Sequence, residues 1–208
     1  MNLIFIGPQG SGKGTQAKLI SEKFGFAHIS TGDLLRGLNG KPKEETDSYM
    51  LSGKLVPDEF IIKILKDRIA KEDCKKGVIL DGFPRNLNQA KELDKIIKIR
   101  AAFNIDISDD EAIKRISGRF LCSGCGAGYN IYTEPRPREE GICDKCGGKL
   151  IQRKDDNKEA VKTRLKTYHE ETIPLLKNYN TIKINGNQAI DKVKNDIEKA
   201  IGFLRLMG

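Results

Sequence analysis

Short apolar runs alternate with stretches of helical periodicity along this chain. Residues 3–6, 26–29, 77–81, 102–107 and 181–184 form runs of the length typical of buried strands. The stretches between them place apolar residues three and four positions apart, as amphipathic helices do. Buried strands that alternate with helices predict an α/β fold, in which helices cover both faces of a parallel sheet.

Start signals locate several of the predicted helices. Asp58 follows a proline and precedes an apolar pattern that runs to Ile69. Ser108 and Glu111 have the spacing of a capping box for a later helix. The other helices are predicted over residues 88–98, 157–180 (bent at Pro174) and 190–204.

Two segments interrupt the alternation of strands and helices. Residues 30–56 are polar and contain no predicted strand, and residues 119–156 are rich in glycine and contain Pro135 and Pro137. We therefore predict two inserted domains in one core. The predicted core domain consists of residues 1–29, 57–118 and 157–208.

A glycine-rich loop over residues 7–15 follows the first predicted strand and opens a helix. It fits the phosphate-binding pattern G-x-x-x-x-G-K-[ST], except that Gly14 takes the Ser/Thr place and Thr15 comes one residue later. Backbone N–H groups of such a loop surround a polyphosphate, and Lys13 adds a compact cation. The alternative is a glycine-rich turn without a ligand, which the combination of strand, lysine and helix disfavours.

Asp81 ends the predicted strand at residues 77–81. In a parallel sheet, this position lies at the carboxyl edge, beside the glycine-rich loop. The residue is predicted to hold Mg²⁺ through water, because Mg²⁺ keeps several of its waters in proteins. The alternative is a capping role in the next turn.

The strongest metal signal is a set of four cysteines with the spacing C-x2-C-x17-C-x2-C. Thiolates bind Zn²⁺ tetrahedrally, and four of them leave no open position, so the predicted ion is structural. Two disulfides, iron, and a zinc ribbon that binds nucleic acid are the alternatives. The four residues are Cys122, Cys125, Cys143 and Cys146.

The formal net charge of +8 is compatible with a nucleic-acid, membrane or phosphorylated small-molecule partner. Acidic residues are mixed with the basic ones nearly everywhere, which favours a solvated surface for most lysines. No apolar run approaches the ~20 residues of a membrane span. The N-terminus has no signal-peptide pattern, so we expect a cytoplasmic location.

Four motifs stand in order along the chain, at residues 7–15, 30–33, 81–85 and 153–156. Together they closely resemble the adenylate kinase family, in its long form with a large lid. The string Asp-Gly-Phe-Pro-Arg at 81–85 is typical of nucleoside monophosphate kinases. The resemblance implies that residues 30–56 bind the monophosphate, that residues 119–156 form the lid, and that a monomer converts ATP and AMP into two ADP.

The resemblance also implies roles for individual residues. Phosphoryl transfer depends mostly on positioning and cationic clamping, and arginine binds phosphate oxygens with a planar fork. The implied catalytic residues are Lys13, Arg85, Arg119, Arg153 and Arg164. The implied ATP-binding residues are Gly10, Ser11, Gly12, Lys13, Gly14, Thr15, Arg115, Arg119, Gly128, Tyr129 and Gln188. The implied AMP-binding residues are Thr31, Arg36, Lys54, Leu55, Val56, Gly82, Phe83, Pro84, Arg85, Gln89, Arg153 and Arg164.

Two rival functions remain at this point. One is a related kinase for CMP, UMP or GMP, which Gln89 disfavours because an amide both donates to and accepts from an adenine edge. The other is a nucleic-acid binder with a phosphate loop and a zinc ribbon. That function has no use for the motif at 81–85. Neither His28 nor His169 belongs to a nucleophilic triad, and we expect both to be structural.

Overall fold

The computed structural model describes residues 1–207 and has a five-stranded parallel sheet at its centre. The strand order is β2-β3-β1-β4-β8, with parallel pairing throughout. The predicted α/β fold is therefore confirmed. The strands are β1 (Leu3–Ile6), β2 (Ala27–Ser30), β3 (Val78–Asp81), β4 (Ala101–Asp106) and β8 (Thr181–Asn185).

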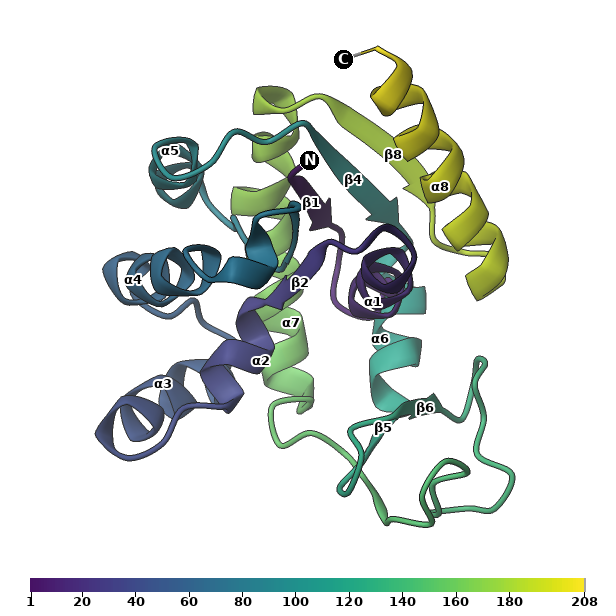
Figure 1. Ribbon diagram of the computed structural model, residues 1–208. Helices are drawn as coiled ribbons and strands as arrows, with labels where there is room; N and C mark the ends of the chain where they lie inside the picture. Colours follow the sequence, from purple (N-terminus) through teal and green to yellow (C-terminus); the bar gives the residue numbers. More distant parts are fainter. Residues whose placement is uncertain (208) are drawn as a thin grey trace.

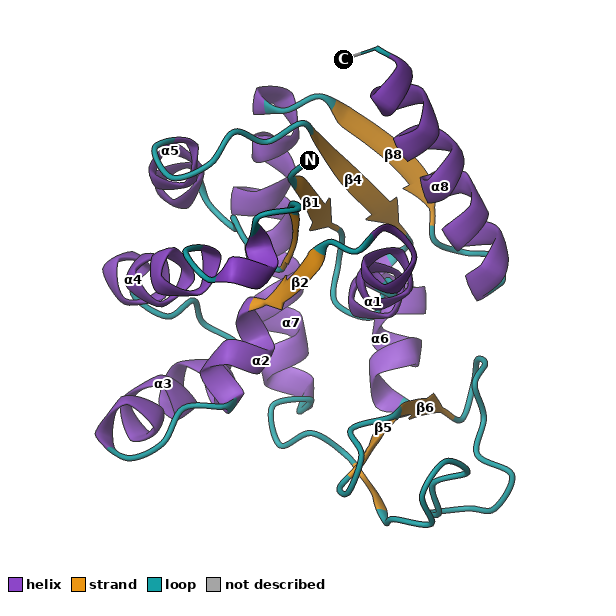
Figure 2. Ribbon diagram, in the orientation of Figure 1, coloured by secondary structure: helices purple, strands orange, loops and turns teal. Residues whose placement is uncertain are grey.

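Helices cover both faces of the sheet (Figures 1 and 2). On one face, α1 (Lys13–Phe24) and α8 (Ile190–Leu206) pack their apolar residues against Phe5 and Phe103. The other face packs against α4 (Asp58–Ile69) and α5 (Leu87–Asp94). Among residues 1–207, none of the helices combines the length and apolarity that crossing a membrane needs.

Two helix starts follow the sequence signals. Helix α4 begins at Asp58, and α6 (Asp109–Ser117) begins after Ser108, whose side chain accepts a hydrogen bond from the Glu111 N–H. The Glu111 carboxylate pairs with Arg115 Nε at 2.7 Å. Ser108 therefore supplies the helix cap, and Glu111 serves to hold an arginine.

Two helices are shorter than predicted. Helix α5 ends at Asp94, and a turn at residues 95–96 and an irregular stretch at residues 97–100 connect it to β4. The helix predicted over 157–180 is regular only in α7 (Lys158–Thr167). A π-helical turn (Tyr168–Thr172) and a 3-10 helix (Ile173–Asn178) follow it. Pro174, which cannot donate to the helical ladder, lies in the 3-10 part.

The two segments that interrupt the pattern lie on the side of the sheet toward which the arrowheads of β1, β4 and β8 point (Figure 1). Residues 30–56 contain α2 (Thr31–Arg36) and α3 (Lys41–Ser52). Residues 119–156 contain a small antiparallel sheet of β5 (Arg119–Cys122), β6 (Gly128–Asn130) and β7 (Leu150–Ile151). Most of this second segment is loop (Figure 2), with a small core of its own around Tyr129 and Leu150.

Candidate functional site

The glycine-rich loop joins β1 to α1 and leaves several polar groups without protein partners. Gly12 precedes α1 with φ of 90°, a left-handed conformation that favours glycine, and no side chain caps the helix. Ser11 is 3% exposed, and its Oγ has no hydrogen-bond partner. A helix N-terminus and a buried hydroxyl that both lack partners fit an anionic ligand.

Lys13 folds back over this loop. Its Nζ donates to the carbonyl oxygens of Gly7 and Pro8, at 2.8 Å each. Burial lowers the pKa of Lys13 to about 8; Asp81 opposes this shift, and Arg85 and Arg119 add to it. The loop therefore holds a cation that a phosphate would stabilise.

Asp81 lies at the end of β3, where its strand pairs with β1 next to the loop. A Cβ at Gly14 would lie 3.1 Å from Asp81 Oδ2, so a larger residue in that place would press on the carboxylate. On the other side, His28 Nε2 lies 3.5 Å from the same oxygen, which gives His28 a place beside the site.

Two of the predicted phosphate-binding arginines, Arg85 and Arg153, have a pKa below the ordinary value because they are buried beside other cations. Burial lowers the pKa of Arg85 to about 10, with further lowering by Arg164 and Arg36. Burial lowers the pKa of Arg153 to about 10 as well, with further lowering by Arg119 and Arg36. The Nε of Arg153 is also buried without a partner. Such a concentration of cations fits a ligand with several negative charges.

Asp155 and Asp156 form ion pairs with these arginines, and the sequence alone predicts no role for either acid. Arg119 donates to both carboxylate oxygens of Asp156, with Nε 2.9 Å from Oδ2. Arg164 Nη2 lies 2.8 Å and Arg36 Nη1 3.5 Å from Asp155 Oδ2. The signal was present in the sequence, as a pair of acids that closes the motif at 153–156.

The predicted AMP-binding residues come from three neighbouring parts of the fold. Thr31 Oγ1 donates to the Gly82 carbonyl at 3.0 Å, which joins the start of α2 to the end of β3. Arg85 Nε donates to the same carbonyl at 2.8 Å. Of the residues after α3, Lys54 is exposed, whereas Val56 is buried in the main core. Phe83 and Pro84 are also buried and support the loop through packing.

Gln89 is 2% exposed, and its side-chain amide already has two partners. Its Oε1 accepts from the Arg85 N–H and its Nε2 donates to Asp58 Oδ1, at 2.8 Å each. The sequence predicts Asp58 as a helix start only, and its carboxylate also accepts hydrogen bonds from Asn86 and Asn88. One amide hydrogen and one oxygen lone pair of Gln89 remain for a ligand.

Two of the residues expected around the ATP base lie together, and one is buried elsewhere. Arg115 Nη1 donates to the Gly186 carbonyl at 3.1 Å, next to the turn that contains Gln188. Gln188 Nε2 donates to Asp196. Gly128 is exposed, but the Tyr129 side chain is 5% exposed and lies inside the lid segment. The Tyr129 ring therefore packs against Cys122 and Cys143 and is not exposed to a ligand.

The sulfur atoms of the four spaced cysteines all lie within 4.8 Å of one another. The Sγ atoms of Cys122 and Cys146 are 3.4 Å apart, and those of Cys125 and Cys143 are 3.6 Å apart. Tetrahedral zinc with bonds of about 2.3 Å separates its sulfurs by about 3.8 Å. All five cysteines of the chain are free thiols, so the two-disulfide alternative is not observed. The donor set fits a tetrahedral metal ion.

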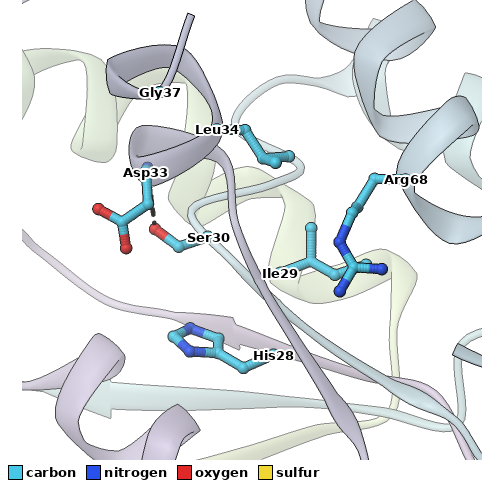
Figure 3. A pocket seen from close by; sticks show the side chains of 7 residues that line it. All are labelled: His28, Ile29, Ser30, Asp33, Leu34, Gly37 and Arg68. Atoms are coloured by element: carbon cyan, nitrogen blue, oxygen red, sulfur yellow. Dashed lines mark hydrogen bonds between the residues drawn. The ribbon is translucent and has the colours of Figure 1, made fainter. Parts of the chain in front are cut away.

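A hollow of about 340 Å³ lies beside β2 and α2 (Figure 3). Its charged groups already have partners, since Asp33 pairs with Arg36, and Arg68 donates to both oxygens of Asp73. It therefore offers little to an anionic ligand. The hollow is lined by His28, Ile29, Ser30, Asp33, Leu34, Gly37 and Arg68.

The comparisons with known proteins agree with this geometry. The family model for adenylate kinase matches residues 5–184. An adenylate kinase of Clostridium acetobutylicum is 48% identical over 97% of this chain and 99% of its own length. Adenylate kinases of Caldicellulosiruptor bescii and Archaeoglobus fulgidus are 45% and 46% identical, over 98% and 95% of this chain and 100% and 96% of their own lengths. The chain therefore belongs to the adenylate kinase family, whose members transfer a phosphoryl group between adenine nucleotides.

Proposed function

We propose that the chain moves the terminal phosphoryl group of Mg-bound ATP directly to AMP, forming two ADP. The observation that carries this proposal is the gathering of Lys13 and the predicted arginines between the glycine-rich loop and the segment 30–56. The transition state spreads negative charge over the moving group, and fixed cations stabilise it. No side chain needs to act as a nucleophile.

On the ATP side, the backbone of the loop would surround the phosphates. The buried Ser11 hydroxyl and the uncapped start of α1 support this role, which Gly10, Gly12, Gly14 and Thr15 would share. Lys13 would turn from its carbonyl partners to the terminal phosphates. Arg115 and the turn at Gln188 would lie along the base, together with Gly128 and the backbone of Tyr129.

On the AMP side, Arg36 and Arg85 would hold the monophosphate. The remaining donor and acceptor of Gln89 would meet the adenine edge, and its bonds to Arg85 and Asp58 keep the amide in one orientation. Thr31, Lys54, Leu55, Val56, Gly82, Phe83 and Pro84 would complete this part of the site. Arg119, Arg153 and Arg164 would close on the group in transfer, because Arg119 lies close enough to Lys13, and Arg164 close enough to Arg85, to act on their charges.

Asp81 would bind Mg²⁺ through water, because its carboxylate faces the loop and Gly14 leaves room beside it. Bound Mg²⁺ would neutralise part of the phosphate charge. In this proposal, residues 30–56 and 119–156 are the moving domains. The remaining segments 1–29, 57–118 and 157–208 are the core.

The four cysteines would hold a structural Zn²⁺ in the lid. The segment has only a small apolar cluster of its own, so a metal would supply the stability that packing does not. Closure of a lid that stays folded would exclude water, and ATP would then not be lost to hydrolysis. We also propose a monomer without nucleic-acid or membrane partners.

The proposal is tested by phosphoryl transfer from Mg-bound ATP to AMP, CMP, UMP and GMP, each measured separately. Rapid ADP formation with AMP alone is the expected result. Faster transfer to another monophosphate would overturn the role of Gln89 in base recognition. It would leave the proposed role of Lys13 and the arginines in phosphate binding intact. A folded protein that transfers to none of them and binds RNA with a steep salt dependence would overturn the kinase proposal.

A further inference from the structure

We infer that Tyr129 is a positioning residue of the cysteine site, whose hydroxyl donates a hydrogen bond to the Cys143 thiolate and thereby strengthens metal binding. This inference rests on the proposed metal-binding lid. It gives the tyrosine a function different from the contact with the ATP base that the sequence predicts.

The hydroxyl lies between two partners whose chemistry fixes its direction. Tyr129 Oη accepts from the Asp144 backbone N–H at 2.9 Å and lies 3.5 Å from Cys143 Sγ. A backbone N–H can only donate, so the phenol oxygen is the acceptor in the first contact. Its single hydrogen remains free, and Cys143 Sγ is the acceptor within reach. The contact is buried, where a hydrogen bond to a charged sulfur has little competition from water.

The cysteines receive hydrogen bonds of two kinds. Cys122 Sγ accepts from the backbone N–H groups of Gly124 and Cys125, at 3.3 and 3.4 Å. Such bonds follow from the turn of the loop, and no side-chain substitution removes them. Cys143 also accepts from a side chain, the Tyr129 phenol. The strength of this one bond is therefore set by the residue at position 129.

The charge of the site explains why this bond matters. Four thiolates around a divalent cation leave an excess of negative charge, which donors to sulfur reduce. Tyr129 is also tied to the lid sheet, since it pairs with Phe120 across β5 and β6. The phenol thus connects the sheet to the second pair of cysteines and fixes the position of Cys143 Sγ.

The test compares Tyr129→Phe with Tyr132→Phe, which removes the same atom from a half-exposed tyrosine of the same lid. Zinc affinity is measured by competition with a chromogenic chelator, and each protein is also loaded with Co²⁺ for absorption spectra. Tyr129→Phe should weaken zinc binding about 10–100-fold, as loss of an outer partner of a metal ligand does. It should also move the sulfur-to-cobalt charge-transfer band to lower energy, because the thiolate loses a donor. Tyr132→Phe should change neither.

A second substitution separates the bond from packing. Site-specific 3-fluorotyrosine at position 129 keeps the shape of the ring but makes the hydroxyl a stronger donor. The cobalt band should then move to higher energy. Unchanged affinity and spectra in both variants would overturn the inference while leaving the metal site intact. An unaltered protein that binds neither metal would instead overturn the metal site itself.

Discussion

Arg119 donates two hydrogen bonds to the Asp156 carboxylate, from Nε to Oδ2 at 2.9 Å and from Nη2 to Oδ1 at 2.5 Å. The Asp156 side chain is 5% exposed, and Gln9 Nε2 donates to it at 3.0 Å. A phosphate accepts two parallel hydrogen bonds from arginine in the same way. The carboxylate thus holds the guanidinium ready for a phosphate and ties the start of the lid segment to its end.

Substitution Asp156→Asn should lower kcat/KM for ATP about tenfold, because loss of one charge-assisted bond costs ~1.5 kcal/mol. The amide keeps the shape but loses the charge and one acceptor, so Arg119 is no longer fixed in one orientation. Initial rates at varied ATP check the prediction. Glu134→Gln is the control, since its pair with Arg136 is exposed and 3.9 Å long. Equal losses in both variants would contradict a specific role for Asp156.

Substitution Arg85→Ala should lower kcat by about 10³-fold or more, because arginines that stabilise the moving phosphoryl group have effects of this size. The fold should survive. Arg85 lowers the pKa of the neighbouring Lys13, and its own pKa is lowered by Arg164, so its removal relieves repulsion between cations. Rates and thermal unfolding curves measured on one preparation test both parts. Near-normal transfer would remove Arg85 from the mechanism.

Much of the fold could be predicted because its signals are local. The strand β1 matches its predicted bounds, since a strand buried on both faces is a continuous apolar run bounded by glycine. The glycine-rich loop and Asp81 were identified for the same reason. Their chemistry follows from residues adjacent in sequence and from the rule that the carboxyl ends of parallel strands meet at one edge.

The parts that could not be predicted depend on packing between distant segments. The bond from Gln89 to Asp58 joins residues 31 positions apart. The buried position of Tyr129 depends on a lid whose few apolar residues produce no clear periodicity. Pro174 alone predicts a bend, but it does not predict that the regular α-helix already ends before Tyr168, which is 7% exposed and packs against the main core.

The rate should depend on pH through Lys13. With its pKa lowered to about 8 in the protein without nucleotide, kcat/KM for ATP should fall tenfold per pH unit above that value. At saturating ATP, the bound phosphates favour the charged form, so kcat should fall only at higher pH. Rates measured from pH 6 to 10 distinguish the two curves. Coincident curves, or a flat kcat/KM, would contradict the assignment to Lys13.

Lys13 should also make the stability of the protein depend on pH, but in the opposite direction: the rate falls as the pH rises, whereas the free energy of unfolding increases. The pKa of Lys13 is about 8 in the folded protein and 10.5 for an unperturbed lysine, so the folded state binds fewer protons than the unfolded state between these two pH values. The cost of burying the Lys13 charge is present in full below pH 8 and is relieved as the pH rises to 10.5. Lys13→Met, which is uncharged throughout, should be more stable than the unaltered protein at pH 7. This advantage should shrink by pH 10.

The role of Gln89 can be separated from general damage to the site. Gln89→Asn shortens the side chain, so the amide cannot bond to Asp58 and Arg85 and still reach a base in the same place. The KM for AMP should rise about tenfold, the effect of losing one well-placed hydrogen bond in a buried site. The KM for ATP should stay the same. Asn88→Ala provides the control, because Asn88 also bonds Asp58 but is exposed. A parallel rise in both KM values would show damage to the fold and not to base recognition.

Metal removal should unfold the lid and leave the core folded. The lid cluster contains two of the four cysteines, so without an ion it keeps only Tyr129 and Leu150 as large buried side chains. The five-stranded sheet and its helices make their own cores, which contain none of the four lid cysteines. After treatment with a strong chelator, limited proteolysis should cut within residues 119–156, and hydrogen exchange should rise there while β1 and β4 remain protected.

Cys74→Ser should respond to the chelator as the unaltered protein does, whereas Cys143→Ser should be cut by the protease without chelator treatment. If the treated lid resists protease as before, its stability comes from packing, and the structural role of the metal is wrong.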